Sequence, residues 1–381
     1  MLKKLIPVLL CMILAFSCFP VNAAEKGLKI KLAAPCAVLM EAGTGKILVE
    51  KNAHQKHACA SVTKVMTLLL TMEAVDSGKL KLTDTLTTSA HAASMGGSDI
   101  WLEEGEEMTV DDLIKATTVA SANDAAVVLA EAICGSEEAF VDRMNKKAKS
   151  LGMNDTLFKN CNGLDEKDHL TSAYDVAVMS AELIKHKKIF KYTSIWLDNL
   201  RGGKTQIVNT NKLLKTYNGI TGLKTGTTND AGCCMSATAE RDGLSLIAVV
   251  LGCKTGTERF ADSAALLDFG FTNYEVKTLE LPDEANGDVA VNGGMVESVK
   301  AECPPAGYVV IPKLGDAKLI RECKLKNDLQ APVKIGDTIG EVCYYSGKEL
   351  LKTCTIKAAE NVEKMTFSSV LGLVLDSLFR V

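Results

Sequence analysis

The sequence lacks any excess of positive charge. Its 381 residues include 43 Lys and Arg against 47 Asp and Glu, which gives a formal net charge of −4. A protein that binds nucleic acid through its phosphates needs a basic face. Nucleic acid is therefore not an expected partner.

The sequence also lacks an apolar run long enough to cross a bilayer, which needs about 20 residues. The run from Leu5 to Phe19 is shorter, follows two lysines and is itself followed by small residues. This arrangement predicts a secretory signal peptide over residues 1–23, cleaved after Ala23, and an exported protein. A lipoprotein attached through Cys18 is the weaker alternative.

Metal-ligand spacings are missing too. The five histidines follow no metal-binding pattern and no Cys-x-x-Cys is present, so we expect no metal and no cofactor. Eleven of the 13 cysteines would remain after cleavage, an odd number, and Cys233 and Cys234 are adjacent. This pattern favours buried thiols in reducing surroundings over a disulfide framework, which stays the alternative.

Apolar periodicity predicts an α+β fold for residues 24–274, expected to form the first of two domains in a chain of this length. Strand-like runs surround a Gly-Thr-Gly turn within residues 36–50, and two more are joined by Asp242-Gly243, a hairpin signal. Between them, apolar residues recur at helical spacing. The predicted helices cover residues 61–76, 111–134, 136–151 and 172–186. This order predicts an antiparallel sheet flanked by helices.

Two further parts follow. Residues 275–362 hold short β-rich pieces separated by Gly, Pro, Asn and Asp, which predicts a small all-β domain. Residues 363–381 carry an apolar helical stripe but are too short, and contain too many charges, to span a bilayer. The stripe consists of Phe367, Val370, Leu371, Val374, Leu378 and Val381. We expect an amphipathic helix at the membrane surface; docking on the protein or on another copy is the alternative.

Three short motifs occur in order along residues 24–274. They are S-x-x-K at Ser61–Lys64, S-x-N at Ser121–Asn123 and K-T-G at Lys224–Gly226. Each is weak alone, and K-T-G occurs again at Lys254–Gly256. The second copy follows a strand-like run, so we expect it in a turn and outside the site. The order and separation of the other three make a joint accident improbable.

The residue types suit nucleophilic catalysis. Ser61 and Lys64 are three apart, so they share one face of a helix and the amine can reach the hydroxyl. A serine needs a base to remove its proton, and burial together with a second cation such as Lys224 would lower the lysine pKa. The free backbone N–H of Ser61 at the helix start could form half of an oxyanion hole.

The other two motifs suit substrate binding and proton transfer. Ser121 and Asn123 fit a loop between helices: Ser121 could pass a proton to the leaving amine, and Asn123 could hold a peptide amide or the Lys64 amine. Lys224 and Thr225 are expected to begin a strand, where a cation and a hydroxyl suit a terminal carboxylate. Gly226 would let a substrate backbone approach closely.

The motifs and the residues around them resemble the low-molecular-mass D-alanyl-D-alanine carboxypeptidases, penicillin-binding proteins, close to the type of spore-forming Gram-positive bacteria. The similarity extends over about residues 30–275. It includes the stretches ASVTKVMT (60–67), GSDIWLEEGEEMTVDDLI (97–114), SANDAAVVLAE (121–131), NCNGLDEKDHLTSAYDVA (160–177) and NGITGLKTGTTNDAGCC (218–234).

The resemblance implies a five-stranded antiparallel sheet with helices on both sides, then a β-rich domain. It implies that Ser61 attacks the bond between two terminal D-alanines of a peptidoglycan stem peptide, that D-alanine leaves, and that water hydrolyses the acyl-enzyme. β-Lactams would acylate the same serine as inhibitors. By position, the backbone N–H of Thr227 would be the second oxyanion donor. Relatives often carry a bulkier residue there, and an apolar residue or proline in place of Cys59.

Three other functions compete with this interpretation. A class A β-lactamase needs a glutamate to activate the deacylating water; Glu166 is present, but outside the Glu-x-x-Leu-Asn setting of those enzymes. A D,D-endopeptidase that cuts cross-links is closer and harder to exclude. A non-enzymatic wall scaffold would have no need of Ser61, Lys64 and Lys224 together.

Overall fold

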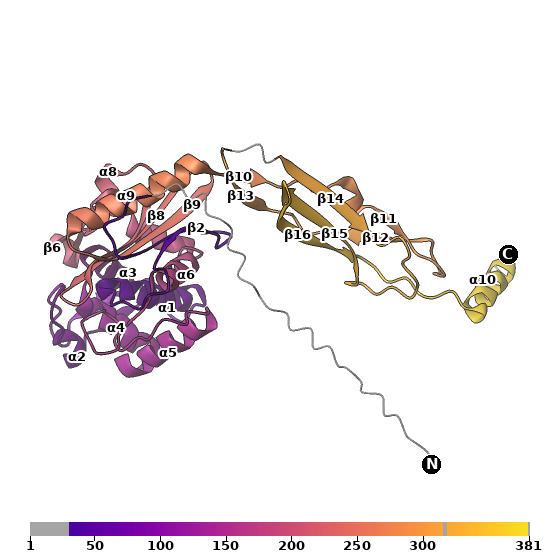
Figure 1. The fold of residues 1–381 in the computed structure, drawn as a ribbon. Coiled ribbons are helices and arrows are strands. Elements are labelled where there is room, and N and C mark those ends of the chain that lie inside the picture. The colour runs from indigo at the N-terminus through magenta and orange to yellow at the C-terminus, as the bar shows by residue number, and fades with distance from the viewer. Residues whose placement is uncertain (1–29, 315–317, 380–381) are drawn as a thin grey trace, which may run out of the picture. The chain divides into compact units, whose positions relative to one another are not determined.

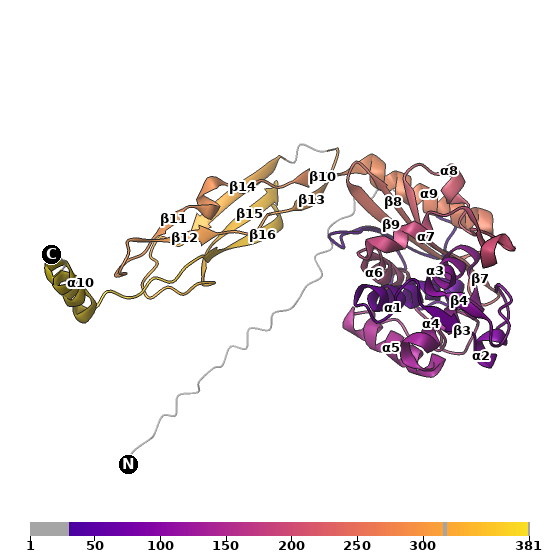
Figure 2. The same ribbon diagram turned by 180° about the vertical axis from the view of Figure 1, so that it is seen from behind.

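The computed structural model describes residues 30–314 and 318–379. The signal peptide predicted over residues 1–23 lies outside these residues. The predicted α+β fold is confirmed (Figures 1 and 2): residues 32–273 form an antiparallel sheet covered by helices, and a β-rich region follows.

The central sheet has five antiparallel strands in the order β2-β1-β9-β8-β7. Their bounds are β1 Cys36–Glu41, β2 Ile47–Lys51, β7 Ile220–Thr228, β8 Gly232–Arg241 and β9 Leu244–Cys253. The predicted turn between the first two strands and the predicted Asp242-Gly243 hairpin are both present. Strand β7 therefore lies at one edge of the sheet, and its outer side is free to meet other segments.

Helices cover both faces of this sheet. Side chains alternate along each strand, so apolar residues of the strands point to both faces. In β1, Val38 and Met40 point into the main core, while Leu39 points to the other face. There α9 packs so closely that a Cβ on Gly270 would lie 3.1 Å from Leu39 Cδ2. The helices are α1 Lys64–Asp76, α2 Ala90–Ala93, α3 Val110–Lys115, α4 Asn123–Cys134, α5 Glu137–Ser150, α6 Ala173–Leu183, α7 Phe190–Thr193, α8 Leu213–Thr216 and α9 Gly256–Asn273.

Short elements complete this part of the chain. Two ribbons pair β3 Thr85–Thr87 with β4 Glu107–Thr109 and β5 Leu197–Leu200 with β6 Thr205–Val208. The 3-10 turns here are Ala60–Thr63, Lys187–Ile189 and Arg201–Gly203, and a π turn covers Ala116–Ala120.

The single helix predicted over residues 111–134 is wrong. α3 passes into the π turn, and the chain then breaks at Ser121, whose φ of 64° is left-handed. Helix α4 begins two residues later, at Asn123. Apolar residues recur at helical spacing on both sides of the break, because each helix buries an apolar face. This periodicity therefore could not reveal the loop that carries S-x-N.

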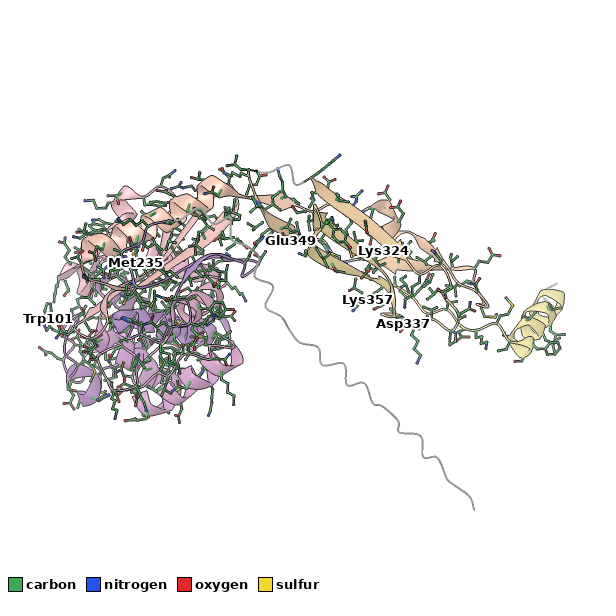
Figure 3. All side chains as sticks on the ribbon, viewed as in Figure 1. Trp101, Met235, Lys324, Asp337, Glu349 and Lys357 are labelled. Carbon is green, nitrogen blue, oxygen red and sulfur yellow. The ribbon has the colours of Figure 1, made fainter. Side chains whose placement is uncertain are left out.

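The β-rich region has its own apolar core. Its five-stranded antiparallel sheet runs β11-β12-β16-β15-β14, and β10 pairs with β13 separately. The strands are β10 Tyr274–Thr278, β11 Asp288–Ala290, β12 Ser298–Glu302, β13 Tyr308–Pro312, β14 Leu319–Leu325, β15 Thr338–Ser346 and β16 Glu349–Ala358, with a 3-10 turn at Asp283–Asn286. Charged side chains such as Lys324, Asp337, Glu349 and Lys357 remain on its surface (Figure 3).

The last helix, α10, covers Phe367–Phe379 and falls within the predicted amphipathic segment. Five of its apolar side chains are exposed, led by Phe367 at 85%. The described part of the chain contains no helix that combines the length and apolarity required to traverse a bilayer. All eleven cysteines in the described part of the chain are free thiols.

Candidate active site

Ser61 lies in the 3-10 turn that leads into α1. The preceding residue, Ala60, has a left-handed φ of 51°, and a Cβ added to Gly163 would lie only 2.0 Å from the Ala60 carbonyl oxygen. This close packing holds the turn in place. Ser61 is half-exposed, whereas Lys64 one turn later is fully buried. Their Oγ and Nζ atoms are 3.0 Å apart.

Two acceptors hold the Lys64 amine. Its Nζ donates to Asn123 Oδ1 at 2.5 Å and to the backbone carbonyl of Asn162 at 2.6 Å. The Asn123 side chain is itself fixed, because its Nδ2 donates to the Gly96 carbonyl at 2.6 Å. The sequence left open whether Asn123 holds a peptide amide or the Lys64 amine, and in this structure it binds the Lys64 amine.

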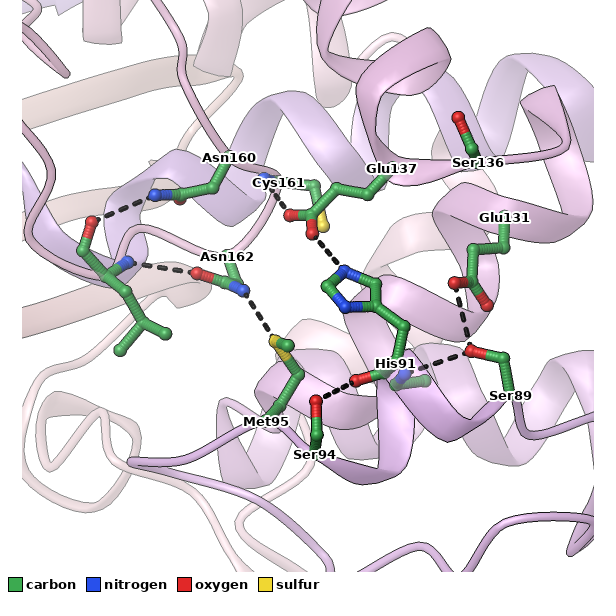
Figure 4. A network of polar contacts seen from close by, with 12 residues as sticks. Ser89, His91, Ser94, Met95, Glu131, Ser136, Glu137, Asn160, Cys161 and Asn162 are labelled. Atoms are coloured by element: carbon green, nitrogen blue, oxygen red, sulfur yellow. Dashed lines mark hydrogen bonds and ion pairs between the residues drawn. The ribbon is translucent and has the colours of Figure 1, made fainter.

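The loop that presents the Asn162 carbonyl is tied down on both sides (Figure 4). The Cys161 N–H donates to Glu137 Oε1 at 3.0 Å, and the other oxygen of Glu137 meets His91 Nε2 at 2.7 Å. Asn162 Nδ2 contacts the sulfur of Met95 at 3.6 Å. Helices α2 and α5 therefore fix the position of the carbonyl that Lys64 uses.

Ser121 and Lys224 form a second pair. Lys224 Nζ donates to Ser121 Oγ and to the Thr225 carbonyl, both at 2.9 Å. The left-handed backbone at Ser121 turns the chain so that this side chain and Asn123 serve one site. Lys224 and Thr225 lie in the middle of β7, which begins at Ile220, so the expectation that they begin a strand is wrong.

Gly226 brings β7 against the Ser61 turn. A Cβ at this position would lie 2.7 Å from the Cys59 carbonyl oxygen and 2.8 Å from the Ser61 nitrogen. Any side chain would therefore push the strand and the turn apart. The glycine is required for contact between two parts of the protein as well as for the approach of a substrate.

Burial lowers the pKa of Lys64 to about 7, against the opposing effects of Cys161 and Asp124. Burial also lowers the pKa of Lys224 well below its usual value, and the cations Lys64 and Arg259 lower it further. The sequence predicted both burial and a second cation such as Lys224 as causes of the Lys64 shift; burial is the main cause for Lys64, and the repulsion between the two lysines acts on Lys224. Two lysines whose pKa values are lowered by burial therefore share one site.

Family comparisons agree with this geometry. Residues 21–255 match the family model described as D-alanyl-D-alanine carboxypeptidase, and residues 274–364 match that of the penicillin-binding protein 5 C-terminal domain. The chain belongs to the D-alanyl-D-alanine carboxypeptidase family. The expected serine-type D-Ala-D-Ala carboxypeptidase is thereby confirmed.

Individual members of this carboxypeptidase family are similar along most of their length. D-alanyl-D-alanine carboxypeptidase DacF of Bacillus subtilis is 41% identical over 97% of both chains. Penicillin-binding protein 5 of Haemophilus influenzae has a solved structure with 30% identity and a TM-score of 0.80, over 88% of this chain and 99% of that one. Penicillin-binding protein D2 of Listeria monocytogenes, solved in an ampicillin-bound form, is 33% identical with a TM-score of 0.59, over 64% and 99% of the two chains.

The second K-T-G lies outside the carboxypeptidase site, as expected. It forms the turn after β9, where the Thr255 side chain accepts from the Glu258 N–H and the Glu258 side chain accepts from the Thr255 N–H. This reciprocal capping box starts α9. The motif letters are the same as at Lys224–Gly226, but here they stabilise a helix end.

Sequence reasoning missed two contributors to the site. The carbonyl of Asn162 carries no signal in the side-chain sequence, since any residue supplies a backbone acceptor. Arg259, in the first turn of α9, donates to the Gly226 carbonyl from 33 residues away. Only its closeness to the second K-T-G could have drawn attention to it.

Proposed function

We propose that Ser61 is the nucleophile of this carboxypeptidase and that neutral Lys64 is its general base. The supporting observation is the arrangement around the Lys64 amine. A neutral amine has two hydrogens and one lone pair, and the two acceptors Asn123 Oδ1 and Asn162 O take the hydrogens. The lone pair is left to face Ser61 Oγ at 3.0 Å and to receive its proton.

The remaining motif residues bind and protonate the departing D-alanine in this proposal. Lys224 and Thr225 hold the terminal carboxylate of the peptide. The proton that Lys64 removes from Ser61 is passed on through Ser121 Oγ, 2.9 Å from Lys224 Nζ, to the leaving amine, so Lys64 becomes neutral again. In deacylation Lys64 takes a proton from the attacking water and gives it to Ser61 Oγ as the acyl bond breaks. Serine and lysine side chains supply every proton transfer in this sequence, so the mechanism uses no cofactor.

The backbone N–H groups of Ser61 and Thr227 form the oxyanion hole of the proposed mechanism. Gly226 brings the two peptides together, since its position lies close to the Ser61 nitrogen. Charge that develops on the carbonyl oxygen would be received by fixed dipoles, which cost no reorganisation during the reaction.

The substrate is proposed to be a peptidoglycan stem peptide ending in D-Ala-D-Ala, met outside the cytoplasmic membrane. A β-lactam would acylate Ser61 and leave slowly; that the Listeria relative was solved with ampicillin bound supports the binding of a β-lactam. Glu166, the residue that a β-lactamase would need, is exposed and accepts from Asn160 Nδ2 at 3.3 Å. Rapid release of the adduct would favour a β-lactamase; cleavage of cross-linked dimers would favour an endopeptidase.

The test combines intact-protein mass spectrometry with an assay of D-alanine release. Penicillin should add one equivalent to the parent protein, and Ser61→Ala should lose both the adduct and the release of D-alanine. Ser94→Ala, which removes an exposed hydroxyl bonded only to the His91 carbonyl, should retain both. An adduct that persists on Ser61→Ala at another residue would refute the site.

We also propose that α10 binds the membrane surface. Its exposed Phe367, Leu371 and Leu375 would enter the interface between headgroups and acyl chains. Deleting residues 363–381 should release the protein from lipid vesicles and leave D-alanine release unchanged. Leu371→Glu should weaken vesicle binding strongly, and Ser368→Glu only slightly. Equal loss in both point variants would indicate that added charge, rather than the apolar stripe, decides binding.

A further inference from the structure

Arg259 is a buried cation without a carboxylate partner. Its side chain is almost fully buried, and no ion pair joins it to an acidic residue within the described part of the chain. Its Nε has no hydrogen-bond partner. Burial lowers the pKa of Arg259, which reflects the cost of this placement. A guanidinium kept in such a place must contribute something other than an ordinary salt bridge.

The contacts of Arg259 point to one peptide group of β7. Nη1 lies 3.0 Å from the Gly226 carbonyl oxygen and 3.0 Å from Thr227 Oγ1, with the Cys234 carbonyl at 3.4 Å. Thr227 Oγ1 in turn donates to the Gly226 carbonyl at 2.8 Å. Two donors thus converge on the oxygen of the Gly226–Thr227 peptide.

The other end of that peptide faces the proposed oxyanion hole. The Gly226–Thr227 bond is trans, so its C=O and N–H point in opposite directions within one plane. The C=O is directed towards Arg259 on the inner side of β7. The Thr227 N–H is therefore directed away from β8, to the open edge of the sheet, and the Ser61 turn packs on the adjacent Gly226.

We propose that Arg259 is a positioning residue that orients and polarises the Gly226–Thr227 peptide for catalysis. This inference rests on the proposed Ser61 acyl-enzyme. A charge-assisted bond to the carbonyl draws electron density from the amide nitrogen, so the Thr227 N–H becomes a stronger donor to the oxyanion. The same bonds prevent the peptide from rotating, which keeps its N–H aimed at the oxygen of the reacting carbonyl.

The second K-T-G acquires a role in this arrangement. Thr255 and Glu258 form the capping box at the start of α9, immediately before Arg259. The cap fixes where the helix begins, and the helix fixes where the guanidinium reaches β7. The motif copy thus supports the site from behind without touching a substrate.

The test measures the acyl-enzyme directly. Difference infrared spectroscopy of the protein acylated by an isotope-labelled, slowly released β-lactam reports how strongly the ester carbonyl is hydrogen-bonded. In Arg259→Met the ester band should move to higher wavenumber, and acylation should slow by roughly 10- to 100-fold, less than or comparable to loss of a whole oxyanion donor. The dissociation constant of the initial non-covalent complex should change less than about two-fold.

Two further variants make the result decisive. Arg259→Lys restores a cation without the planar guanidinium and should recover part of both effects. Arg241→Met removes an arginine whose guanidinium donates to the Asn218 carbonyl, lies 4.0 Å from Asp268 and stacks on the rings of Tyr217 and Phe271, and it should leave the band in place. These measurements apply to any variant that remains folded. If Arg259→Met does not fold, Arg259→Lys, which retains the charge, takes its place.

Two outcomes would overturn the inference. One is an unshifted band in a folded Arg259→Met protein or, where only Arg259→Lys folds, a band and an acylation rate that are both those of the parent. The other is a loss that lies wholly in the non-covalent dissociation constant, which would mean that Arg259 binds the substrate carboxylate. Failure of the parent protein to form any adduct at Ser61 would instead refute the proposed function, so the two failures are distinguishable.

Discussion

The two folded regions differ in what they bury. In residues 32–273 the interior contains charged and polar side chains, among them Lys64, Lys224, Asp124 and Arg259. Within the described part of residues 274–379, the buried positions are apolar residues, cysteines and Tyr344. Both regions have an antiparallel sheet, so the sheet itself does not require the polar interior. The difference lies in the chemistry that only the first region performs.

Buried cations weaken a fold, since each loses its hydration and is only partly compensated by acceptors. The peptidase region accepts this cost at the points where motifs meet. The β-rich region, whose core includes Val299, Ile339 and Ile356, follows the ordinary rule that apolar side chains fill the interior. Changes at the buried polar groups of the first region should therefore alter activity more than stability, and changes in the apolar core of the second should do the reverse.

The largest expected effect comes from the glycine of the first K-T-G. In Gly226→Ala the added Cβ would overlap the Cys59 carbonyl and the Ser61 nitrogen, both closer than 3.0 Å. The strand must move away from the oxyanion hole, so penicillin acylation should slow by at least about 100-fold, as on losing an oxyanion donor. Stopped-flow or quenched mass spectrometry of Ser61 labelling measures this rate.

The second K-T-G offers a matched control. A Cβ on Gly256 would meet nothing closer than Arg259 Nη2, at 3.6 Å, and alanine suits a helix better than glycine. Gly256→Ala should acylate at the parent rate. If both variants lost activity alike, the assignment of the two motif copies to different tasks would be wrong.

The acylation rate should change by about ten-fold per pH unit below the pKa of Lys64. Burial lowers its pKa to about 7, and only the neutral amine can accept the Ser61 proton. The acylation rate should therefore rise with pH up to about 7 and then level off. Rates of penicillin labelling across pH 5.5–9 test this. A rate that does not level off by pH 9, as expected for the ordinary lysine value of 10.5, would exclude Lys64 as the neutral base.

The same pKa shift affects stability with a definite sign. Between about pH 7 and 10.5 the unfolded chain binds a proton at Lys64 that the folded chain does not. The contribution of Lys64 to the free energy of unfolding therefore increases as pH rises through this window. Because Lys224 is shifted in the same direction, the peptidase region carries two such contributions from buried lysines.

The sequence was sufficient for the sheet, the β-rich region and the identities of the motif residues. Hairpin signals and alternating apolar residues depend on local patterning, which is why the turn before β2 and the Asp242-Gly243 hairpin were predicted correctly. The break at Ser121 was not predicted, because no residue type in this stretch indicates a left-handed backbone at a serine. The pairing of Lys64 with Asn123 was one of two open possibilities, since contacts between distant segments depend on packing that spacing does not specify.

The other features of the site that the sequence could not predict depend on backbone atoms. The Asn162 carbonyl and the Gly226–Thr227 peptide act through main-chain groups that every residue possesses. Their value comes from position, fixed by Glu137 and Met95 in one case and by Arg259 in the other. A motif search finds side chains that react; it does not find the segments that aim a peptide bond.

The smallest effect on activity should follow a large change in the β-rich core. Ile356 is fully buried there, and Ile356→Ala should lower the free energy of unfolding of that region by about 2–5 kcal/mol. Acylation of Ser61 should stay within about two-fold of the parent rate, because no catalytic contact described above involves this core. Thermal unfolding monitored together with penicillin labelling measures both quantities.

Leu69→Ala, in the helix that carries Lys64, is the matched deletion in the other region, where loss of stability should be accompanied by slower acylation. Equal loss of acylation in the two variants would show that the regions act as one unit and would end the contrast between a reactive interior and an apolar one.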